Sequence, residues 1–180
     1  MAKLSSEPEV ISLARQLNVP KDEDPVEGII SYCLDRLQAW CKNQPNICTI
    51  QALGELVCEK LKLGVVEIDS DEQLKQFVSD RVNERDLVFA QIPATFEDAQ
   101  TYAALYERKK GDLSRHRYFA VIDCRGDKAA RRFFSRWHEI AHMITLHDQL
   151  EFPFHRSVLE RDPIERLMDA IAAEIGFYRP

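Results

Sequence analysis

Apolar residues recur at helical spacing near the start of the chain. Val10, Leu13, Ala14 and Leu17 occupy positions i, i+3, i+4 and i+7, which lie on one face of an α-helix. Pro20 follows, and a proline disfavours helical backbone at the residue before it. The pattern therefore predicts a short helix that ends before Pro20.

Two more helices are predicted in the next forty residues. Asp24 is a typical N-cap residue, and Pro25 suits the first helical position. The apolar stripe of this helix consists of Ile29, Ile30, Cys33, Leu34, Leu37, Trp40 and Cys41. The next helix begins at Thr49 and continues to Leu61, and Gly64 is expected to take the left-handed conformation that often follows a helix.

The middle of the chain alternates predicted strands and helices. The β-branched run at residues 65–68 predicts a strand, and Ser70 or Asp71 is expected to cap a fourth helix. Residues 87–92 (LVFAQI) have the length and the apolar content of a strand that ends at Pro93. Residues 99–106 are expected to be partly helical.

A third strand and two helices are predicted in the last third. Tyr118–Asp123 (YFAVID) reads as a strand that reaches a turn at residues 125–127. Helix resumes near Lys128 and has a wide apolar face formed by Phe133, Phe134, Trp137, Ile140, Ala141 and Ile144. Asp162 and Pro163 repeat the cap-plus-proline signal and begin the last helix.

The composition is that of an ordinary globular domain. The chain has 180 residues, 45% hydrophobic and 30% charged, without the run of about 18 apolar residues that a membrane span needs. The N-terminus lacks the pattern of a secretory signal, so a cytoplasmic location is expected. The net charge of −6 argues against direct binding of nucleic acid. The odd number of cysteines, five, without C-x-x-C spacing predicts reduced, mostly buried thiols.

The segment WHEIAHMI at residues 137–144 contains the candidate chemistry. Residues four apart on an α-helix differ by about 40° in direction and about 6 Å in height, so His138 and His142 can converge on one ion. Zinc suits two neutral imidazoles, and Glu139 is placed to act as a general base beside it. The alternative is an ordinary amphipathic helix with two packed or hydrogen-bonded histidines.

A third ligand has to come from another part of the chain. Glu165 and Asp169 stand four apart on one face of the last helix, where Glu165 can complete a two-histidine, one-glutamate set. Asp169 can then accept a hydrogen bond from a liganding imidazole. Its apolar neighbours favour this pair over a solvated charged face. Glu160 and Glu174 remain rival ligands.

Several segments together resemble the ImmA/IrrE family of bacterial metallopeptidases. They are YFAVID, RRFFSRW, HEIAHMITLH and ERLMDAIAAEIGFYRP, and the resemblance is specific only from about residue 117. His138, Glu139, His142 and Glu165 fall on matching positions. The chain departs from the family pattern at four positions: Met168, Asp169, Ile171 and Gly176.

The resemblance implies a compact gluzincin-like α+β domain, rich in helix, with a small mixed sheet packed on the HExxH helix and one zinc ion between two helices. It also implies cleavage of a helix-turn-helix transcriptional repressor of the phage or stress-response type. Residues 49–180 would form this domain. Residues 1–48 would form an N-terminal helical segment, either an accessory packing unit or a docking element. Because a helix stops close to the last residue, the domain is expected to belong to a longer polypeptide.

The expected mechanism assigns the catalytic proton transfers to Glu139. His155, Tyr178 and Arg136 are candidates for contacts with the oxyanion or the substrate, although sequence cannot place them around the metal. Two other classes of function stay open. One is a non-proteolytic zinc-binding regulatory or protein-interaction module, and the other is a metal-free helical interaction domain.

Overall fold

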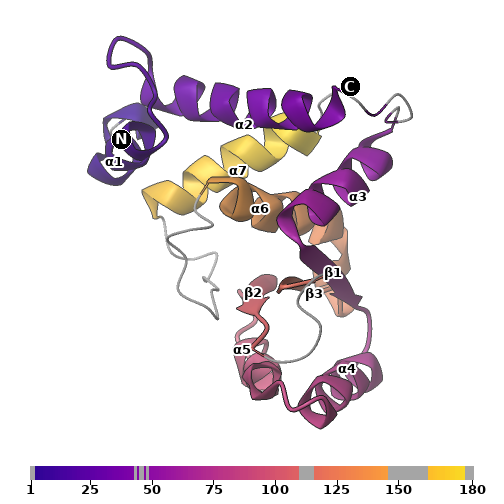
Figure 1. The fold of residues 1–180 in the computed structure, drawn as a ribbon. Helices are drawn as coiled ribbons and strands as arrows, with labels where there is room; N and C mark the ends of the chain where they lie inside the picture. The colour runs from indigo at the N-terminus through magenta and orange to yellow at the C-terminus, as the bar shows by residue number, and fades with distance from the viewer. Residues whose placement is uncertain are drawn as a thin grey trace.

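The computed structural model describes residues 3–42, 44, 47, 49–109, 116–145 and 162–176, and Figure 1 shows their arrangement. They form an α+β fold in which helices surround a small mixed sheet, as predicted. The α-helices are α1 (Pro8–Gln16), α2 (Pro25–Cys41), α3 (Ile50–Leu61), α4 (Asp71–Asn83), α5 (Ile92–Thr95), α6 (Arg132–Thr145) and α7 (Pro163–Gly176). The strands are β1 (Leu63–Ile68), β2 (Ala103–Glu107) and β3 (Tyr118–Asp123), and short 3-10 helices cover Leu4–Ser6, Leu87–Gln91 and Gly126–Arg131.

The predicted helix starts have the expected caps. The Asp24 side chain accepts hydrogen bonds from the backbone N–H groups of Val26 and Glu27, and Pro25 occupies the first turn of α2. Ser70, rather than Asp71, caps α4. These bonds satisfy N–H groups that have no partner inside the helix, which explains why the two helices begin where they do.

Gly64 does not end α3, contrary to the prediction. Lys62 takes the left-handed conformation, with φ of 52°, and Gly64 lies inside β1 opposite Phe119. A Cβ atom on Gly64 would lie 2.7 Å from the Phe119 ring. This glycine is therefore needed for a close approach between strands and not for a turn.

Residues 87–92 do not form the predicted strand. They form the 3-10 helix Leu87–Gln91 and the start of α5. Phe89 and Ile92 are buried, whereas Leu87 is 67% exposed. Buried positions three residues apart match the period of a 3-10 helix, and a short apolar run alone does not distinguish this from a strand.

The prediction of partial helix at residues 99–106 was also wrong, because β2 begins at Ala103. Ala103, Ala104, Leu105 and Tyr106 are all buried. A strand covered on both faces shows no alternation of polar and apolar residues, and alanine and leucine favour helix. Neither the hydrophobic pattern nor the residue propensities of this segment therefore indicate a strand.

The sheet has the order β1-β3-β2. β1 runs parallel to β3, with Leu63 opposite Tyr118, and β2 runs antiparallel to β3. After β3 the chain turns at Gly126, whose φ is 55°, as the predicted turn requires. A 3-10 helix over Gly126–Arg131 then leads into α6, so regular α-helix begins four residues after Lys128.

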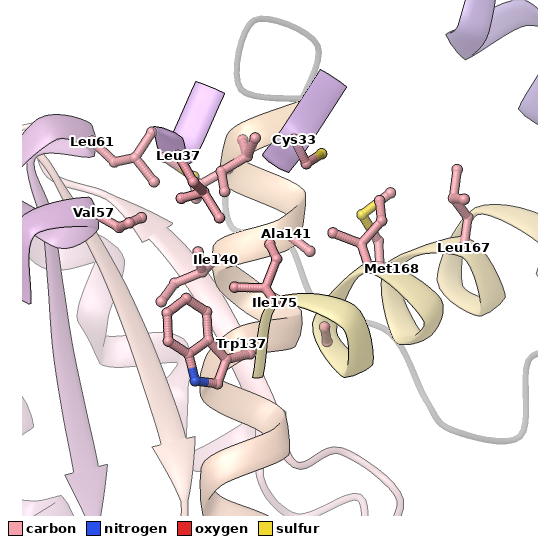
Figure 2. Packing of buried hydrophobic residues seen from close by; sticks show 14 of the residues in the cluster. Cys33, Leu37, Val57, Leu61, Trp137, Ile140, Ala141, Leu167, Met168 and Ile175 are labelled. Carbon is pink, nitrogen blue, oxygen red and sulfur yellow. The ribbon is translucent and has the colours of Figure 1, made fainter. Parts of the chain in front are cut away.

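One apolar cluster joins the N-terminal helices to α6 and α7. In Figure 2, Leu37 of α2, Val57 of α3 and Ile140 of α6 point into this cluster, and all three are fully buried. A second cluster on the other side of the sheet includes Phe89 and Phe119. Each fully buried aliphatic side chain contributes about 1.5–3 kcal/mol. Helix α6 buries its apolar face in the first of these clusters. This burial fixes the direction in which the opposite face of α6 points.

Among the described residues, none of the helices combines the length and the apolar content that a membrane crossing requires.

Candidate metal centre

Helices α6 and α7 pack against each other and bring the motif residues together. His138 and His142 lie one turn apart on α6, and Glu165 lies in the first turn of α7. His142 is fully buried, and the side chains of His138 and Glu165 are 16% and 14% exposed. The three groups thus meet at the edge of the core, close to solvent.

The donor atoms of these three residues converge on one another. Nε2 of His138 lies 3.1 Å from Nε2 of His142 and 3.1 Å from Oε2 of Glu165. Nε2 of His142 lies 3.4 Å from Oε1 of Glu165. All three candidate ligand atoms lie within 4.8 Å of one another, so this group could hold a metal ion. No ion is needed to explain why the helices pack, but the donor set is one that zinc accepts.

Asp169 lies beside the imidazole of His138. Its Oδ1 is 2.9 Å from Nδ1 of His138, on the side of the ring away from Glu165. A proton on Nδ1 donated to Asp169 leaves Nε2 free to act as a ligand. The carboxylate thereby selects the tautomer in which Nε2 faces the cluster.

The electrostatics of the pair oppose the effect of burial. Burial alone would lower the pKa of His138, but hydrogen bonds with Asp169 and Glu165 raise it to about 10. Burial would raise the pKa of Glu165, but hydrogen bonds from His138 and His142 hold it well below its usual range. Both shifts thus favour the charged forms of the two groups, a protonated imidazole at His138 and an ionised carboxylate at Glu165.

Glu139 is the buried carboxyl group of the motif. It is 6% exposed, and its Oε2 has no hydrogen-bond partner among the described residues. Burial, together with the nearby Glu165 carboxylate, raises its pKa to about 7 against the attraction of His138. A buried carboxyl oxygen without a partner is costly. Such a group is explained when a cation and a water molecule occupy the adjacent space, so the chain's residues fit a bound metal.

The structure does not bring every predicted site residue to the cluster. The side chain of Arg136 bonds to Cys58 and lines, together with β1, a groove on another face of α6. Glu174 is exposed near the end of α7. His155, Tyr178 and the rival ligand Glu160 lie outside the described residues.

Sequence reasoning missed a contact that holds α6. The guanidinium of Arg36, on α2, donates a 2.9 Å hydrogen bond to the backbone oxygen of Ile144, in the last turn of α6. It also lies 5.2 Å from the Trp40 ring. A cation suits the carbonyl end of a helix. The two residues are 108 positions apart, and no local pattern in the sequence links them.

No protein-family model, no curated protein and no solved structure matches this chain. The resemblance to the ImmA/IrrE family thus depends on the motifs alone.

Proposed function

We propose that this protein is a zinc-dependent endopeptidase of gluzincin-like architecture. The observation that supports this proposal is the convergence of His138, His142 and Glu165 beside the buried, unpartnered oxygen of Glu139. Three protein ligands with an acid next to them are typical of catalytic zinc sites, whereas a structural site closes with a fourth protein ligand.

The roles of the residues follow from their positions. His138, His142 and Glu165 would hold Zn²⁺, which supplies Lewis acidity toward a carbonyl group and toward water. Glu139 would accept the proton of the attacking water at Oε2 and return it to the leaving nitrogen. A pKa near 7 suits a group that both accepts and releases a proton at neutral pH. Asp169 would keep His138 in the ligand tautomer.

The substrate we propose is a helix-turn-helix transcriptional repressor, acted on in the cytoplasm. This part of the proposal comes from the resemblance of the motifs to the ImmA/IrrE family. The net charge of −6 favours a protein substrate over direct contact with DNA.

Two measurements test the proposal. Purified protein should bind about one equivalent of zinc, and a chelator should remove it together with part of the thermal stability. The protein should also cleave a purified helix-turn-helix repressor encoded in the neighbouring open reading frame. Glu139→Gln should lower the rate of cleavage about 10²- to 10⁴-fold while zinc stays bound.

The outcomes separate the three classes of function. Cleavage that persists undiminished in Glu139→Gln would refute the assigned mechanism. Bound zinc without cleavage by either protein would favour the non-proteolytic zinc module. Less than about half an equivalent of zinc, with no shift of the melting temperature on zinc addition, would favour a metal-free interaction domain.

A further inference from the structure

β1 has one paired edge and one free edge. It is the first strand in the order β1-β3-β2, so among the described residues only β3 pairs with it. Figure 1 shows it at one side of the sheet, between α3 and α4. Val65, Val66 and Glu67 are only partly buried. β1 contains no proline, lysine or arginine, which are common guards of exposed edges.

The backbone groups of three residues point to the free edge. The oxygen atoms of Lys62 and Ile68 accept hydrogen bonds from Tyr118 and Cys124, so these even-numbered positions face β3. Backbone groups of successive strand residues face alternate edges. The N–H and C=O groups of Leu63, Val65 and Glu67 therefore point away from β3.

A groove of about 670 Å³ follows this edge. It is lined by β1 from Leu63 to Val66, by α3, and by the side chain of Arg136 on α6. The Nε atom of Arg136 is buried and has no hydrogen-bond partner among the described residues. The groove thus offers backbone groups and an apolar strand, with the Arg136 guanidinium, which also bonds to Cys58, and the carboxylates of Glu55 and Glu59 beside them.

This groove is separate from the metal centre. Arg136 and His138 are two residues apart on α6, and their side chains differ by about 200° in direction. Whatever binds beside Arg136 therefore approaches α6 from a different side than a substrate of the metal centre.

We propose that a second copy of this chain binds here, with the two β1 strands antiparallel about a two-fold axis at Val65. In this register Val65 pairs with Val65 of the second copy, and Leu63 lies opposite Glu67 of the second copy. The outward N–H and C=O groups of both strands then bond to each other. The two three-stranded sheets become one sheet of six strands.

One pair of opposite charges, Arg136 and Glu67 of the second copy, favours a second copy over an unrelated peptide. Residues directly opposite each other in an antiparallel pair project from the same face of the sheet. Glu67 of the second copy thus reaches the side of the groove where Arg136 lies. Within one chain Glu67 is 3.4 Å from Arg132 and 29% exposed, so its carboxylate is accessible. Each copy would supply both Arg136, on α6, and Glu67, on β1, so the two-fold axis would form the contact twice.

The first experiment measures self-association by sedimentation velocity between about 1 and 200 µM. The full chain is expected to form a dimer in this range. Val65→Pro removes an N–H group from the free edge without removing a bond between β1 and β3, and should weaken dimerisation at least about tenfold. Glu174→Ala, which changes an exposed side chain of α7 outside the groove, is the control and should still dimerise. A wild-type chain that stays monomeric at about 200 µM overturns the proposal.

The second experiment tests the register by exchanging the charges. Glu67→Lys and Arg136→Glu should each weaken the dimer, and an equimolar mixture of the two variants should form a heterodimer. Circular dichroism melts of each variant confirm that it is folded. A wild-type dimer whose affinity neither substitution changes overturns the pairing of Glu67 with Arg136. This result stays decisive even if Val65→Pro fails to fold.

Discussion

Oδ1 of Asp169 lies 2.9 Å from Nδ1 of His138, and so links the two helices that carry the candidate ligands. Asp169 is 52% exposed, whereas the imidazole is largely buried. The carboxylate itself does not reach the cluster. Its effect on a metal ion would therefore act through the orientation and the tautomer of the ring.

Removing this carboxylate should weaken zinc binding. Asp169→Ala is expected to raise the dissociation constant for zinc about 10- to 100-fold, since partners of liganding histidines typically have effects of this size. Asp169→Asn should retain part of the affinity, because its amide oxygen still accepts a hydrogen bond from Nδ1. Competition with a chromophoric chelator measures both constants.

The control for this prediction is Glu174→Ala, which removes an exposed carboxylate further along α7. It should leave zinc affinity unchanged within about a factor of two, whereas Asp169→Ala should not. Equal affinities for wild type and Asp169→Ala would contradict the role given to the His138 contact.

Local spacing made most of the site predictable. Two histidines four apart on a helix must share a face, and Glu165 and Asp169 share a face for the same reason. Whether those two faces meet depends on how α6 packs on α7, which the sequence does not state. The structure brings them together, with the ligand atoms within 4.8 Å.

The wrong predictions concern segments in which tertiary packing, and not local residue propensity, determines the backbone conformation. β2 is rich in alanine and leucine and is covered on both faces, so neither propensity nor alternation marked it as a strand. Lys62 takes a left-handed conformation that a glycine usually adopts. The contact of Arg36 with Ile144 is a tertiary contact, and no local sequence pattern predicts it.

The Arg36 contact should stabilise the end of α6. Arg36→Met keeps an apolar stem but removes the donor to the Ile144 oxygen, and should lower the free energy of unfolding by about 1–3 kcal/mol. Part of this loss reflects the helix dipole, which favours a cation at this end. Urea denaturation followed by circular dichroism measures it.

Arg36→Lys separates the effect of the positive charge from that of the guanidinium's hydrogen bond to Ile144. This variant retains the cation and should recover part of the free energy of unfolding that Arg36→Met loses. Arg15→Met, on α1, removes an exposed arginine as a control and is expected to change the free energy of unfolding by less than about 0.5 kcal/mol. A loss as large in Arg15→Met as in Arg36→Met would refute the specific role of the Ile144 contact.

The N-terminal helices should unfold together with the motif helix. Trp40 lies in α2 and Trp137 in α6, and both pack on the same apolar cluster. In the variants Trp40→Phe and Trp137→Phe, the one remaining tryptophan reports on one of these helices. The two fluorescence transitions in urea should each coincide with the loss of circular dichroism in the same variant, as a single cooperative unit requires.

A substitution in the core of α2 also tests whether α2 and α6 unfold together. Leu37→Ala removes a fully buried side chain of α2 and should cost about 2–5 kcal/mol. It should move the transition reported by Trp137 as far as the one reported by Trp40. A Trp137 transition that stays in place while Trp40 shifts would show that residues 1–48 unfold independently.

The cap of α2 should make stability depend on acid pH. Hydrogen bonds from Lys3 and Ser5 lower the pKa of Asp24 to about 2. Because the pKa of Asp24 is lower in the folded state, its stabilising contribution is fully present above the unfolded value, about 3.9, and is lost as the pH falls toward 2. Solvent screening keeps this contribution below about 1 kcal/mol, since Lys3 is 78% exposed.

Asp24→Asn isolates the effect of the charge, because asparagine caps helices about as well as aspartate. The difference in the free energy of unfolding between wild type and Asp24→Asn should shrink as the pH falls from 5 to 2.5. Ser5→Ala, which removes one of the two hydrogen bonds that side chains donate to Asp24, should move that loss to higher pH. Urea titrations at four pH values measure these differences. A difference that stays constant over this range would mean that Asp24 acts only as a cap and not through its charge.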